Sequence, residues 1–143
     1  MFAPSQLQVR QFFCGTYRKW REGAPLIPME VLAADWIAEH PEYHAELADE
    51  AAALDKVYTV EEGRTNPFLH LSMHLSITEQ HGIDQPTGIR QALDLLSAKL
   101  NSRHEAQHVA MEALGQMVWE SQRSGRPPDG EAYLEAVRRA ATR

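Results

Sequence analysis

The segment FLHLSMHLSITEQHG, residues 68–82, decides the fold that this sequence predicts. Its apolar side chains occupy positions all around a helix, which is typical of a helix in the interior of a bundle. Pro67 fits the first turn of that helix, and Gly82 fits its end. His70 and His74 would then lie one turn apart on the same face. The segment therefore predicts a central, buried helix that carries two imidazoles.

Proline and glycine divide the rest of the chain into further helical segments. The breaks are EGAPLIP, DQPTG and RPPDG, and Ser102 followed by Glu105 is typical of a helix start. We expect helices over residues 5–22, 28–37, 41–54, 67–82, 89–100, 102–125 and from 129 onward. The stretch KVYTVEEG predicts one short extended segment near 57–60, which cannot form a sheet alone. The sequence therefore predicts an all-α protein, a single-domain helical bundle over residues 1–143.

Composition narrows the class of protein. The 143 residues are 43% hydrophobic and 24% charged, as in ordinary globular domains. The net charge of −6 and the absence of a basic run argue against a nucleic-acid partner. A single cysteine, Cys14, fits a reducing compartment. No stretch is apolar enough for a signal peptide or a membrane span, so we expect a cytoplasmic protein. The sequence does not indicate an oligomeric state.

The spacing of four residues between two histidines occurs three times in this chain. HPEYH contains His40 and His44, and HEAQH contains His104 and His108. Seven histidines placed at random would give roughly 0.3 such pairs. Imidazoles four residues apart on a helix can both reach one metal ion. The three pairs therefore predict a histidine-rich metal centre.

Seven side chains are the candidate ligands of this centre. They are His40, His44, His70, His74, His104, His108 and Glu112, the last one turn beyond His108. Six imidazoles exceed the needs of one tetrahedral ion, so either two ions bind or some histidines support the ligands. Imidazoles completed by a carboxylate in a helical bundle favour iron, with zinc as the alternative. Such a centre could activate or sense a small molecule such as oxygen or peroxide, or store metal.

Two other hypotheses compete with this one. HEAQH also matches the His-Glu-x-x-His pattern of zinc hydrolases, in which Glu105 would be the general base. However, Ser102 could hold Glu105 in a capping box, and this hypothesis leaves the other two histidine pairs unexplained. The second alternative is a non-enzymatic interaction module with structural histidines.

Stretches along nearly the whole chain resemble an uncharacterised bacterial family, domain-of-unknown-function family 1841. They include MFAPSQLQVRQFF, HPEYH, TNPFLHLSMHL, IDQPTGIR and AQHVAMEALGQMVWESQR. That resemblance implies no activity. The chain is also similar in its chemistry to hemerythrin-like diiron bundles, which use His-x3-Glu, His-x3-His and His-x4-Asp segments. The corresponding segments here are His108–Glu112, His70–His74 and, with Glu in place of Asp, His74–Glu79. This second resemblance implies a diiron centre held between helices.

Overall fold

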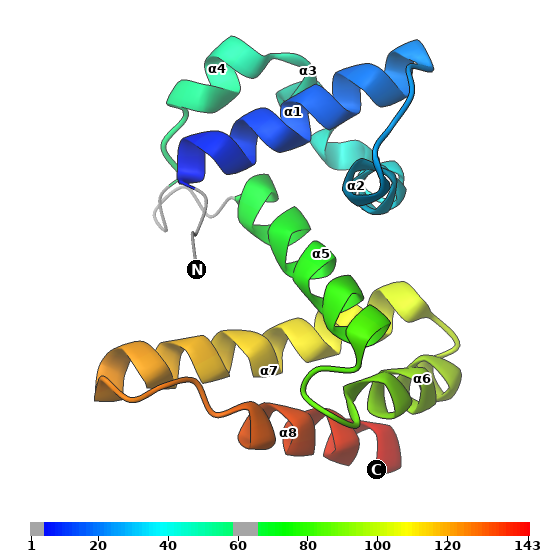
Figure 1. Ribbon diagram of the computed structural model, residues 1–143, viewed down its shortest axis with the longest axis vertical. Helices are drawn as coiled ribbons and strands as arrows, with labels where there is room; N and C mark the ends of the chain where they lie inside the picture. The colour runs from blue at the N-terminus through cyan, green and yellow to red at the C-terminus, as the bar shows by residue number, and fades with distance from the viewer. Residues whose placement is uncertain (1–4, 59–65) are drawn as a thin grey trace. The chain divides into compact units, whose positions relative to one another are not determined.

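The computed structural model describes residues 5–58 and 66–143 of the chain (Figure 1). In these residues it contains eight α-helices, one 3₁₀ helix and no β-strand, which confirms the all-α prediction. The chain divides into two compact units, Met1–Leu75 and Ser76–Arg143. The boundary between the two units falls inside helix α5, Pro67–Ile83. That the chain forms a single domain stays a prediction. Of the predicted extended segment, residues 57 and 58 have no regular structure, and 59 and 60 lie outside the described residues.

The first unit is built around its longest helix, α1. Its elements are α1 (Gln6–Glu22), α2 (Pro28–Ala38), η1 (Pro41–Tyr43), α3 (His44–Ala48), α4 (Glu50–Asp55) and the first half of α5. Helix α1 packs against α2, α3 and α4 (Figure 1). The core that these helices enclose includes Phe13, Trp36, Ile37, Leu47, Phe68 and Leu71. Helix α5 therefore contributes large apolar side chains to the core of this unit.

The helix predicted over residues 41–54 is broken into shorter pieces. Pro41 begins a 3₁₀ turn, α3 follows, and the chain leaves helical geometry at Asp49, where φ is −108° and ψ is 77°. The carboxylate of Asp49 accepts a hydrogen bond from the N–H of Ala52 at 3.3 Å and so caps α4. An aspartate that bonds to the backbone in this way competes with a continuous helix. The prediction of one helix was therefore wrong at Asp49.

The second unit contains the remaining turns of α5 with α6 (Ile89–Leu100), α7 (Arg103–Ser124) and α8 (Gly130–Thr142). Helices α6, α7 and α8 pack against one another, and Leu93 and Leu96 of α6 and Leu134 of α8 are buried. The Ser102 hydroxyl accepts from the N–H of Glu105 at 3.0 Å, so α7 begins where the sequence predicted. It ends at Gly125, whose positive φ of 71° suits a glycine.

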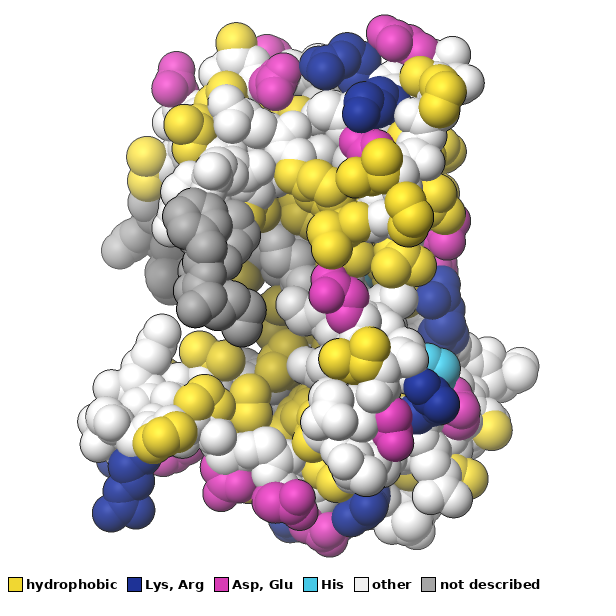
Figure 2. Space-filling view, viewed as in Figure 1, with side chains coloured by type: hydrophobic (Ala, Val, Ile, Leu, Met, Phe, Trp, Pro, Cys, Tyr) yellow, Lys and Arg dark blue, Asp and Glu magenta, His cyan; other side chains and the backbone are white. Residues whose placement is uncertain are grey.

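Hydrophobic side chains are exposed on the surface of the first unit. Figure 2 shows them gathered over α2, and Ile27, Met29 and Val31 are among the exposed residues there. In the described part of the chain, no helix combines the length and the apolar character that crossing a bilayer requires.

Candidate metal centre

His40 follows the end of α2, and its ring is turned back onto that helix. The side chain is buried, and its Nδ1 donates a hydrogen bond to the carbonyl oxygen of Trp36 at 2.7 Å. A carbonyl can only accept, so Nδ1 carries the proton of the neutral ring. The other nitrogen, Nε2, then presents its lone pair. A backbone carbonyl in this position is a common way to orient a metal-binding imidazole.

Helix α5 brings two more imidazoles to His40. His70 and His74 lie one turn apart, with ring centroids 4.8 Å from each other. The Nε2 atom of His70 lies 3.1 Å from Nε2 of His40, and the His74 ring centroid lies 4.8 Å from that of His40. We call these three residues the histidine trio. All three belong to the first unit, and His74 is fully buried.

Aromatic rings surround the trio and fix its orientation. The Trp36 ring stacks on His74, with centroids 3.9 Å apart and planes 13° from parallel. The Tyr43 ring lies parallel to His40 at 5.3 Å, and its pKa is raised by burial and by nearby carboxylates. Trp36 was not among the side chains that the sequence predicted for this site. Its position four residues before His40, near the end of the helix predicted over residues 28–37, was the signal that could have identified it.

The structure separates His44 from His40. His44 Nε2 donates to the carbonyl oxygen of Ile37 at 2.8 Å, and its ring lies against Tyr17 and Trp20. The two histidines do not share a helical face, because Pro41 begins a 3₁₀ turn between them. One nitrogen of His44 is thus engaged by a carbonyl, and its role as a ligand stays a prediction.

The second unit carries the pair His104 and His108 at the start of α7. Their ring centroids are 4.5 Å apart, and the Nε2 atoms of both are buried. We call these two residues the α7 pair. The Glu105 carboxylate lies 3.6 Å from Nδ1 of His108 and is 65% exposed. A carboxylate beside Nδ1 orients the ring so that Nε2 can bind a metal.

The remaining candidates lie on the surface. Glu112 and Glu79 are both exposed. The imidazole of His81, the histidine outside the three pairs, lies 2.7 Å from the Asp94 carboxylate, and both side chains are exposed. His81 therefore has the environment of an ordinary surface residue.

Histidines that could hold a metal ion are thus present in both units: His40 and His74 in the first, His104 and His108 in the second. All four of these residues are histidines, and imidazole nitrogens are suitable ligands for iron, zinc, copper and nickel. The fold and these side chains define an all-α protein with histidines that could hold a metal.

The family follows from the sequence as a whole. The family model of the domain of unknown function DUF1841 matches residues 5–139 of the 143. The chain belongs to this family, which confirms the resemblance given above. No curated protein and no solved structure is significantly similar to the chain.

Proposed function

We propose that the protein binds transition metal through its histidines, with the histidine trio as one set of ligands and the α7 pair as another. The distance of 3.1 Å between the Nε2 atoms of His40 and His70 is the observation that carries this proposal. Two imidazole nitrogens bound to one ion at about 2.1 Å are about 3.0 Å apart at a right angle and about 3.4 Å apart at a tetrahedral angle. The observed distance lies between these values.

The tautomer of His40 adds support. Because its Nδ1 donates to the Trp36 carbonyl, its Nε2 faces His70 as a lone pair, which is the form that ligates. An N–H···N hydrogen bond from His70 would also give this distance. That second arrangement corresponds to a purely structural role for the histidines, and metal analysis distinguishes the two.

We propose iron as the metal, in a centre of two ions, with zinc as the alternative. Imidazoles bind both metals, so the carboxylate content of the site decides between them. Glu112 lies one turn beyond His108 on α7 and is the carboxylate that would favour iron. An iron centre of this kind would supply redox chemistry toward oxygen or peroxide, in catalysis or in sensing.

A zinc hydrolase based on HEAQH is the second candidate. The contact between Glu105 and Nδ1 of His108 favours it in one respect, since it holds the imidazole in a ligating orientation. The same contact counts against the hydrolase in another respect. It places the Glu105 carboxylate against an imidazole, whereas a general base must be close to the water that it deprotonates.

The metal content of protein purified without an affinity tag tests these proposals. About two iron ions per chain with a visible charge-transfer band would support the diiron centre. About one zinc ion, with a peptidase activity that is lost in Glu105→Gln, would support the hydrolase. His40→Ala and His70→Ala should each lower the metal content, and His81→Ala is the matched control. Absence of bound metal, together with a melting temperature that a chelator leaves unchanged, would refute both.

A further inference from the structure

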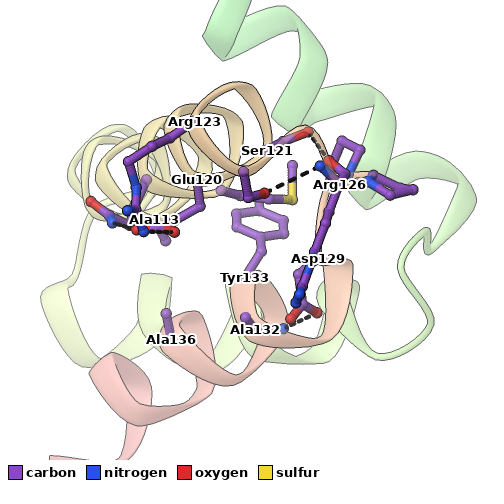
Figure 3. Close-up of a pocket in the computed structure, with 14 residues that line it drawn as sticks. Ala113, Glu120, Ser121, Arg123, Arg126, Asp129, Ala132, Tyr133 and Ala136 are labelled. Carbon is purple, nitrogen blue, oxygen red and sulfur yellow. Dashed lines mark hydrogen bonds and ion pairs between the residues drawn. The ribbon is translucent and has the colours of Figure 1, made fainter.

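A groove lies between the C-terminal half of α7 and helix α8. Its volume is about 770 Å³, and all its lining residues belong to the second unit. Its apolar lining consists of Ala113, Met117, Pro127, Pro128, Ala132, Tyr133 and Ala136. In Figure 3 the Tyr133 ring points between the two helices, and Arg126 lies at one end of the groove. Sites for small molecules are typically of this size, with mainly apolar walls and few polar groups.

The acidic groups along the groove are engaged within the protein. The Glu120 carboxylate accepts hydrogen bonds from Arg123 at 2.8 Å and from Gln116 at 3.3 Å. The Asp129 carboxylate accepts from the N–H of Ala132 at 3.0 Å and caps α8. The two carboxylates that line the groove are therefore already bound to groups of α7 and α8.

The three hydroxyl groups along the groove also have partners within the protein, and Ser124 Oγ accepts from the N–H of Arg126 at 3.2 Å. Tyr133 donates to the side-chain oxygen of Gln80 at 2.6 Å, and Ser121 donates to the carbonyl oxygen of Arg126 at 2.6 Å. Burial raises the pKa of Tyr133 to about 12, so its ring is a neutral part of the floor. The hydroxyl protons of Tyr133 and Ser121 are therefore not available to a bound molecule.

One charged group of the groove remains. Arg123 pairs with Glu120 and lies over the Trp119 ring, with its guanidinium carbon 5.0 Å from the ring centroid. In the part of the chain that the structure describes, the Arg126 guanidinium makes no ion pair and no side-chain hydrogen bond. The groove thus combines an apolar floor with a single available cation at one end.

We propose that this groove binds a small amphipathic carboxylate, with its alkyl or aryl part on the apolar floor and its carboxylate on the Arg126 guanidinium. The planar fork of a guanidinium matches the two oxygens of a carboxylate. A single available cation selects a monoanion. The groove and the histidines involve different residues, so this proposal and the metal proposal can fail separately.

Titration with 4-phenylbutyrate tests the proposal, with the neutral 4-phenylbutyramide as the matched probe. From the size of the probe we expect saturable binding with a Kd on the order of 0.1–1 mM. The amide should bind at least about tenfold more weakly, because it cannot form the charge-assisted contact. Backbone amide NMR shifts should map to residues 113–136.

Variants locate the contact. Arg126→Gln should weaken binding of the carboxylate about tenfold, and Ala132→Trp should abolish it by filling the groove. Arg139→Gln removes the same charge from an exposed position of α8 outside the groove, so it should leave the Kd unchanged. The proposal is overturned by a lack of saturable binding, by equal binding of acid and amide, or by equal effects of Arg126→Gln and Arg139→Gln.

Discussion

A buried arginine joins α1 to the end of α4, and its replacement gives the sharpest test of the first unit. Arg10 is only 8% exposed, and its Nη1 donates to the carbonyl oxygens of Ala53 at 2.9 Å and Lys56 at 2.6 Å. These carbonyls belong to the end of α4, where a helix has no backbone partners for them. The guanidinium carbon also lies 5.4 Å from the ring centroids of both Tyr58 and Phe68.

Replacing Arg10 by methionine keeps most of the side-chain length and removes every donor. Each hydrogen bond from a charged donor contributes about 1.5–3 kcal/mol, and each cation–π contact about 0.5–1 kcal/mol. Relief of the buried guanidinium from its desolvation cost offsets part of this loss. We expect Arg10→Met to lower the free energy of unfolding by about 3 kcal/mol.

Urea unfolding followed by circular dichroism measures this loss. With a slope near 1.5 kcal/mol per molar urea, the midpoint should fall by about 2 M. Arg18→Met is the matched control on α1, because Arg18 lies 3.4 Å from Glu50 with both side chains exposed. That pair should contribute less than about 1 kcal/mol. If the two variants differ by less than about 1 kcal/mol, Arg10 does not stabilise the end of α4 as argued.

Two further predictions concern ionisable groups in the same unit. Burial, reinforced by the Glu50 charge, raises the pKa of the Cys14 thiol to about 11. A thiol reagent at pH 8 should therefore label Cys14 only as the protein unfolds. Rapid labelling of the native protein would contradict this prediction. The backbone N–H of Ile27 and the Lys19 ammonium lower the pKa of Glu30 below its usual value of 4.5. The ionised Glu30 carboxylate therefore stabilises the folded protein above pH 4.5, and this contribution is lost as the pH falls through the lower pKa of the folded state. Glu30→Gln should therefore flatten the acid limb of a plot of urea midpoint against pH, and an unchanged limb would refute this.

The helix boundaries that the sequence predicted are those with a local chemical cause. Ser5 and Ser102 each accept an N–H three residues later, and Gly125 adopts a positive φ at the end of α7. Such capping contacts involve neighbours in sequence, so their signals can be read locally. Asp49 could equally have continued a helix or capped a new one. The packing of α3 and α4 against α1 is non-local, and the residues of the segment alone do not reveal it.

The candidate site was predicted where the spacing of histidines coincides with a continuous helix. His70 with His74, and His104 with His108, meet this condition, and in both pairs the rings are adjacent. His40 does not, because a residue before proline avoids the helical region and its φ and ψ are −128° and 63°. Its ring joins the trio through a turn whose geometry the spacing does not encode.

Trp36 explains how imidazoles from two separate segments, His40 and His74, keep one arrangement. Its carbonyl holds Nδ1 of His40, and its ring stacks on His74, so one residue of α2 orients two members of the trio. Trp36 is itself almost fully buried in the core of the first unit. The orientation of these two imidazoles therefore depends on the packing that stabilises this unit. A site organised in this way loses little conformational freedom when an ion binds, and preorganisation of this kind favours affinity.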